Sequence, residues 1–97
     1  MTLKTEGALQ SYFKRQAASH GILWRKIKFE GQRGCPDILI AYQSKIVLIE
    51  LKSPTKKGRL SELQKRQIKK FKDVGITVHV VDNKEQVDNA ISEITNP

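Results

Sequence analysis

The stretch Asp37-Ile-Leu-Ile-Ala-Tyr-Gln-Ser-Lys-Ile-Val-Leu-Ile-Glu-Leu-Lys52 decides the fold. It contains two apolar runs, residues 37–42 and 45–52, which only Gln43 and Ser44 separate. This spacing predicts two antiparallel strands joined by a tight two-residue turn. Both runs are apolar almost throughout, so we expect both faces of the sheet to be covered, as helices would cover them.

The register of this hairpin brings two acids together. If Gln43 and Ser44 form the turn, Tyr42 pairs with Lys45, and Asp37 then lies opposite Glu50 on the same face. Side chains opposed in this way have Cβ atoms about 4.5–5.5 Å apart, where like charges repel. A divalent cation would explain the pair, because closely spaced carboxylate oxygens suit Mg²⁺ or Mn²⁺. Exposure of both acids at a frayed strand end is the alternative.

Lys52 follows Glu50 by two residues, so its ammonium group projects from the same face of the strand. It either neutralises one of the acids, or it positions the attacking water or stabilises charge that develops on a phosphate. Carboxylates, a metal ion and one lysine together indicate hydrolysis of a phosphodiester bond.

The rest of the chain supplies elements around the hairpin. We predict helices over residues 3–19, from Ser61 to Gly75 and from Asn83 onwards, and further strands over 22–29 and 76–81. The order is αβββαβα, an α/β fold in which helices flank a mixed central sheet and a parallel crossover follows Glu50. Residues 1–97 form a single domain.

Two polar residues outside the hairpin are further candidates. Glu6 falls inside the apolar stripe of the first helix, where it forms a buried ion pair, for example with Lys52, or reaches the metal directly or through water. Gln64 ends a capping box that begins at Ser61, and the box alone would explain it. Gln10, beside Glu6, faces the site or merely lines it. In the second helix, Leu63, Phe71 and Val74 are expected on or near the core stripe, with Ile68 at its edge.

The composition narrows the function classes. Eighteen Lys and Arg against ten Asp and Glu give a net charge of +8, which attracts polyanions such as nucleic acid. A single cysteine excludes an internal disulfide. No apolar run approaches the roughly 20 residues of a membrane span, and no secretion signal is recognised at the N-terminus. We expect a soluble protein in the cytoplasm of a bacterial cell, or of a host cell if a phage encodes it.

The motifs resemble those of a known family. Gly34-Cys35-Pro36-Asp37 followed by Glu50-Leu51-Lys52 is similar to the signature of the PD-(D/E)XK nuclease superfamily. Together with Glu6 and Leu60-Ser61-x-x-Gln64, it resembles the VRR-NUC (virus-type replication-repair nuclease) domain. The resemblance implies a restriction-endonuclease-like core and a catalytic site of Asp37, Glu50, Lys52, Glu6 and Gln64. It also implies Mg²⁺, with Mn²⁺ as a substitute, bound by Asp37, Glu50 and the backbone carbonyl of Leu51. A contact of Glu6 with the metal, directly or through water, stays one of the two alternatives given above for this residue.

Relatives that consist of this domain alone resemble Holliday-junction resolvases of DNA repair and act as homodimers, and the shortness of the chain favours that group. The first helix or Trp24 would form the dimer interface, although Trp24 would equally suit the core or a DNA contact. Two alternatives stay open: a sequence-specific or end-processing nuclease, and a non-catalytic basic DNA-binding module. DNA phosphates would be bound by basic residues around the motifs, namely Arg33, Lys56, Lys57, Arg59, Lys65, Arg66 and Lys69, and also by Lys26 and its neighbours.

Overall fold

The computed structural model describes residues 3–56 and 59–97 of the chain. The sequence of elements is α1 (Glu6–Ser19), β1 (Leu23–Lys26), β2 (Ile38–Tyr42), β3 (Lys45–Leu51), η1 (Pro54–Lys56), α2 (Glu62–Asp73), β4 (Thr77–Val81) and α3 (Lys84–Thr95). Apart from the short 3₁₀ turn η1, this is the predicted order αβββαβα. No helix in the described ranges is long and apolar enough to cross a membrane.

The four strands form one sheet in the order β1-β2-β3-β4. β2 is antiparallel to both β1 and β3, while β3 and β4 are parallel, so the sheet is mixed as predicted. Tyr42 pairs with Lys45 and Ile38 with Ile49, which confirms the register of the hairpin. Gln43 and Ser44 have φ angles of 45° and 68°. A two-residue turn with positive φ at both positions matches the twist of the strands it joins, even without a glycine.

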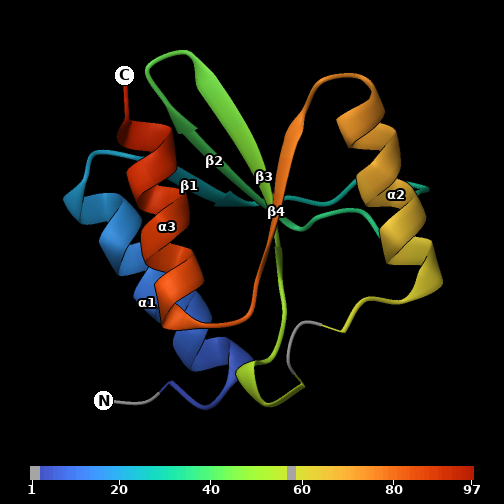
Figure 1. Ribbon diagram of the computed structural model, residues 1–97, viewed down its shortest axis with the longest axis horizontal. Helices are drawn as coiled ribbons and strands as arrows, with labels where there is room; N and C mark the ends of the chain where they lie inside the picture. Colours follow the sequence, from blue (N-terminus) through green and yellow to red (C-terminus); the bar gives the residue numbers. More distant parts are fainter. Residues whose placement is uncertain (1–2, 57–58) are drawn as a thin grey trace.

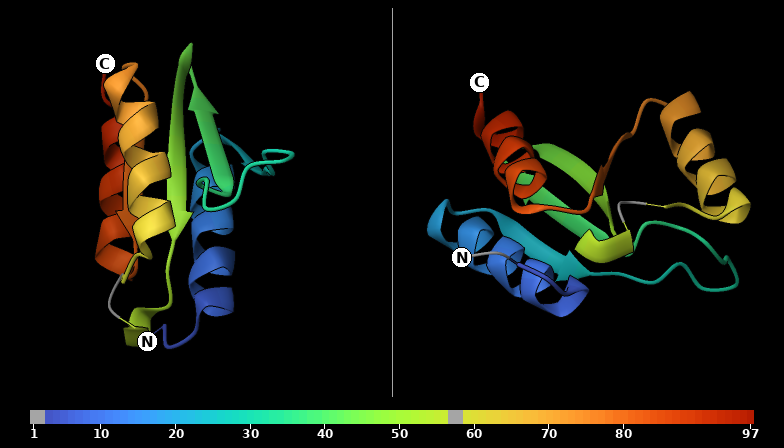
Figure 2. Two further views of the ribbon diagram at one scale, coloured as in Figure 1. Left: turned by 90° about the vertical axis from the view of Figure 1, so that its right-hand side faces the viewer. Right: turned by 60° about the horizontal axis from the view of Figure 1, so that its bottom comes forward.

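Helices cover both faces of the sheet. In Figure 1, α1 and α3 lie together on one side of β4 and α2 lies on the other, and the right-hand view of Figure 2 shows the same arrangement. The larger core packs residues of α1 and α3, such as Phe13 and Ile91, against Ile38, Ile40 and Ile49 of the sheet. The smaller core contains three buried residues, Ile68 of α2 with Leu48 and Val78. This two-sided covering explains why the strands are apolar throughout.

Some boundaries differ from the sequence-based expectation. Helix α1 begins at Glu6, not residue 3, because the Thr5 hydroxyl caps it by accepting a hydrogen bond from the Ala8 amide at 3.0 Å. The first strand covers only Leu23–Lys26. Trp24 is 8% exposed and belongs to the larger core, so it is not available as an interface or DNA contact. Val74 is 76% exposed, which contradicts its expected place on the core stripe of α2.

Candidate active site

The hairpin places Asp37 and Glu50 opposite each other. Glu50 is the penultimate residue of β3 and only 5% exposed, and Asp37 directly precedes β2. Continuing the observed pairing of Ile38 with Ile49 by one step pairs Asp37 with Glu50. The Asp37 carbonyl accepts a hydrogen bond from the Ile27 amide at 2.9 Å, so its backbone is held beside the sheet. The juxtaposition predicted from the sequence is therefore present.

Each of these carboxylates has a buried oxygen that lacks a hydrogen-bond partner in the described part of the chain, Oδ1 of Asp37 and Oε1 of Glu50. Burying an unpaired carboxylate oxygen is costly, and few native structures leave such atoms without a ligand. Burial, followed by the charge of Asp37, raises the pKa of Glu50 to about 7. A divalent cation bound between the two acids would satisfy both oxygens and offset their repulsion. The residues therefore fit a metal site.

The protein contributes few side-chain ligands to such a site. Within residues 3–56 and 59–97, no group of three or more His, Cys, Asp or Glu side chains lies close enough to hold a metal ion. Mg²⁺ typically binds to one or two carboxylates and keeps several waters, which substrate phosphates then replace in part. Two facing carboxylates thus suit an ion that completes its coordination with backbone carbonyl, water and substrate oxygens.

Lys52 and Gln64 approach the acids from the α2 side of the sheet. The half-buried Lys52 donates from Nζ to Oε1 of Gln64 at 3.3 Å, and Nε2 of Gln64 donates to Oε2 of Glu50 at 3.5 Å. The same Oε1 accepts the Ser61 amide at 3.0 Å, and the Ser61 hydroxyl accepts the Gln64 amide at 3.1 Å. Gln64 therefore completes the predicted capping box and also links Lys52 to Glu50, so the two roles are compatible.

Lys26, which the sequence grouped only with the DNA contacts, belongs to this cluster. Its Nζ forms an ion pair with Oδ2 of Asp37 at 3.0 Å and donates to Oε1 of Gln10 at 3.3 Å. Pairing of Lys26 with Ile38 in the sheet places it next to Asp37. The contact between Lys26 and Asp37 could not be predicted from the hairpin, because it depends on the pairing register between β1 and β2. Gln10 therefore contacts the site indirectly, through its hydrogen bond with Lys26.

Glu6 is exposed, so its expected burial on the apolar stripe of α1 is wrong. It lies in the first turn of α1, and this turn is at the same end of the molecule as the C-terminal end of β3 (Figure 1). Within the described residues it forms no ion pair with Lys52. The pKa of Glu50 is raised mainly by burial and by the charge of Asp37, while Lys52 lowers it. The charge of Glu6 raises this pKa further, by a smaller amount. Glu6 therefore influences the site electrostatically without joining the two acids as a direct ligand.

The backbone conformation and the packing at residue 34 explain why the Gly34-Cys35-Pro36-Asp37 motif begins with a glycine. Its φ is +81°, and a Cβ atom there would lie 2.8 Å from Cγ of Leu63 and 3.3 Å from the backbone nitrogen of Gln64. The loop that leads to Asp37 therefore packs directly on the first turn of α2. This contact sets the position of Asp37 relative to Gln64.

Most of the predicted DNA-binding residues lie on the surface. Arg33, Arg59, Lys65, Arg66 and Lys69 are exposed. Lys65 pairs with Glu62 and Lys69 with Asp73 along α2, so their charges are partly neutralised. Lys57 lies outside the described residues, as does the side chain of Lys56.

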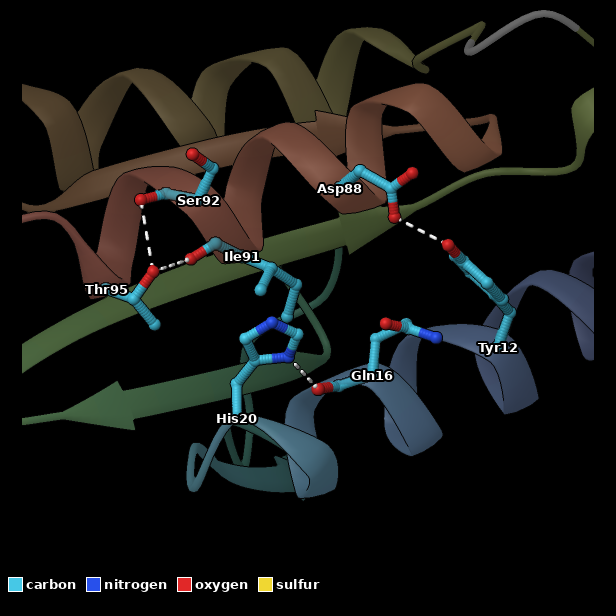
Figure 3. Close-up of a pocket in the computed structure, with 7 residues that line it drawn as sticks. All are labelled: Tyr12, Gln16, His20, Asp88, Ile91, Ser92 and Thr95. Atoms are coloured by element: carbon cyan, nitrogen blue, oxygen red, sulfur yellow. Dashed lines mark hydrogen bonds between the residues drawn. The ribbon is translucent and has the colours of Figure 1, made fainter.

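A hollow of about 440 Å³ lies elsewhere, between α1 and α3 (Figure 3). Its polar groups pair with one another: the Tyr12 hydroxyl donates to Asp88 at 2.6 Å, and Nδ1 of His20 lies 2.8 Å from the Gln16 carbonyl oxygen. None of the candidate catalytic residues lines this hollow, so it is separate from the candidate active site at Asp37 and Glu50.

Comparison with known proteins identifies the class and then the family. Residues 3–85 match the family model of the VRR-NUC domain. A solved structure described as a VRR_NUC domain superposes with a TM-score of 0.82 at 32% sequence identity, covering 93% of this chain and 97% of that chain. No curated protein matches significantly. The fold and the site define a nuclease domain of the PD-(D/E)XK type, whose members are metal-dependent and act on DNA. The chain belongs to the VRR-NUC family, which confirms the resemblance noted from the motifs.

Proposed function

We propose that this protein is a Mg²⁺-dependent endonuclease that hydrolyses phosphodiester bonds in branched DNA, with the four-way junction as its substrate. The observation that carries the proposal is the pair of facing acids, Asp37 and Glu50, each with a buried oxygen without a partner. Lys52 lies beside them in a fixed position. A DNA-binding module without catalytic function would have no need for this costly arrangement.

Asp37, Glu50 and the backbone carbonyl of Leu51 would hold the cation, with Glu6 acting through a bound water. Mn²⁺ would substitute for Mg²⁺. When bound, the cation supplies Lewis acidity at the reacting phosphate and lowers the pKa of the attacking water. Glu50 must be ionised to serve as a ligand, so cation binding weakens below its pKa of about 7.

Lys52 supplies a positive charge that does not depend on the cation. Because Gln64 holds its Nζ at 3.3 Å, the ammonium group is positioned before substrate arrives. A preorganised charge of this kind stabilises negative charge that develops on the phosphate oxygens in the transition state. We therefore assign transition-state stabilisation to Lys52 and its positioning to Gln64.

DNA binding would rest on phosphates, through Arg33, Arg59, Arg66 and the basic residues of α2. Such contacts are strongly salt-dependent and carry little sequence information, so the shape of the branched duplex would provide selectivity. A four-way junction requires two symmetric cuts. A homodimer would present two matched sites to this two-fold substrate.

Cleavage of a labelled four-way junction, compared with linear duplex of the same sequence, tests the substrate. We expect cleavage of the junction in Mg²⁺ or Mn²⁺, none in EDTA, and much slower cleavage of the linear duplex. Equal rates on both substrates would exclude selectivity for branched DNA and favour an end-processing or sequence-specific nuclease.

Substitutions separate an enzyme from a binding module. Asp37→Asn and Lys52→Ala should each lose cleavage by at least about 100-fold while they retain junction binding measured in Ca²⁺. Asp73→Asn, which removes an exposed acid on α2, serves as the matched control and should cleave normally. Cleavage by Asp37→Asn at the wild-type rate would overturn the assignment of the site.

A further inference from the structure

Two lysines flank the acid pair from opposite sides of the sheet, and each is held by a glutamine from a helix. On the α2 side, Lys52 donates to Oε1 of Gln64 at 3.3 Å. On the α1 side, Lys26 donates to Oε1 of Gln10 at 3.3 Å. The motifs account for the first pair but not for the second.

The second pair acts on one particular oxygen. Lys26 binds Oδ2 of Asp37 at 3.0 Å, whereas Oδ1 of the same carboxylate is buried and has no partner among the described residues. Fixing one oxygen of a carboxylate restricts rotation of the group and so fixes the other oxygen. Lys26 therefore determines the orientation of Oδ1, the oxygen available to a cation, without occupying it.

We propose that Lys26 is a positioning residue of the active site, which holds Asp37 in its ligand orientation and is itself anchored by Gln10. This inference rests on the proposed function of Asp37 as a metal ligand. The side chains of Lys26 and Asp37 are 52% and 39% exposed, and ion pairs this accessible change the Tm of a small domain by only a few degrees. Orientation of Asp37 is thus the better explanation of the contact.

Kinetics of Lys26 variants test the proposal. Lys26→Met removes the ammonium group and keeps an unbranched side chain, and Lys26→Arg keeps the charge. As the control, Lys14→Met removes the same charge from an exposed lysine of α1 that has no role in the site. At saturating protein and Mg²⁺, the single-turnover cleavage rate of Lys26→Met should fall about 10-fold or more. Lys26→Arg should recover part of the loss, and Lys14→Met should cleave like the wild type.

Junction affinity in Ca²⁺ distinguishes positioning from simple DNA contact. The Kd should rise by less than about 3-fold in Lys26→Met, because the variant loses only one charge near DNA. A raised Kd with an unchanged cleavage rate would show that Lys26 only binds phosphate, and would overturn the proposal. An unchanged rate and Kd would overturn it as well.

Thermal unfolding without metal gives a readout independent of cleavage. In EDTA at pH 8, Asp37→Asn should raise Tm by about 2–5 °C more in the Lys26→Met background than in the wild type, because it removes an acid that has lost its counter-ion. Equal Tm shifts in the two backgrounds would show that the pair does not form, and would overturn the inference. If the wild type cleaves no DNA, the proposed function fails while this cycle still tests the pairing; if only the Lys26 effect is missing, the inference alone fails.

Discussion

Replacing Glu50 by glutamine measures how much the buried charge of Glu50, and its repulsion with Asp37, cost the stability of the fold. The substitution keeps the size of a side chain that is 5% exposed, and its amide oxygen can still accept the hydrogen bond from Gln64. What it removes is a buried negative charge opposite Asp37. The pKa of Glu50 is raised from 4.5 to about 7, by burial first and by the charge of Asp37 second.

The sign of the effect follows from proton binding. The folded protein holds the Glu50 proton more tightly than the unfolded chain, so in metal-free protein this group costs stability as the pH rises from about 4.5 through about 7. The full shift corresponds to about 3 kcal/mol. We therefore expect Glu50→Gln to raise the free energy of unfolding by about 2–3 kcal/mol at pH 8, but by less than about 1 kcal/mol at pH 5.

Guanidinium unfolding in EDTA at the two pH values measures this difference, with Glu30→Gln as a control at an exposed acid. The control should change the free energy of unfolding by less than about 0.5 kcal/mol at either pH. Added Mn²⁺ should stabilise the wild type more than Glu50→Gln, since the variant has lost a charged ligand. Equal stability of the wild type and Glu50→Gln in EDTA at pH 8 would refute the reasoning.

Two further substitutions test how the site is assembled. Gly34→Ala should lower the free energy of unfolding by about 1–3 kcal/mol, because φ is +81° and the new Cβ would lie 2.8 Å from Cγ of Leu63. Gly7→Ala is the control and should not lower this free energy, because the space around Gly7 is open. Chemical denaturation measures both, and a Gly34→Ala protein of wild-type stability would contradict the close packing. Ser61→Ala should cost about 1 kcal/mol by removing the cap of α2 and should also slow cleavage, since Gln64 loses its alignment. A loss of stability with cleavage at the wild-type rate would argue against this coupling.

The hairpin and the acid pair were predictable because their geometry is local. Two apolar strands and a two-residue turn permit one register, and that register alone places Asp37 opposite Glu50. The capping box at Ser61 was predictable for the same reason, since it depends on residues three positions apart. These features decide most of the fold and the centre of the site.

The sequence alone did not predict the features that depend on packing between distant parts of the chain. Glu6 lies on the apolar stripe of α1, but the helix begins at that residue, so its side chain stays in solvent. The role of Lys26 depends on the register between β1 and β2, which a long loop joins. In α2, Gln67 is buried, whereas Leu63 and Val74, which were expected on or near the core stripe, are exposed. The helical wheel gives the direction of a side chain but not how far the partner surface extends.

The two-residue turn at Gln43 and Ser44 also limits how the chain length can change. A residue inserted within β2 or β3, between the turn and an acid, would move that carboxylate to the opposite face, under α1 and α3. Residues added to the turn itself can bulge outward and leave the strands paired as before. We therefore expect variation in length to be tolerated at the tip of this hairpin but not within its strands, where an insertion would displace the carboxylates of the candidate active site.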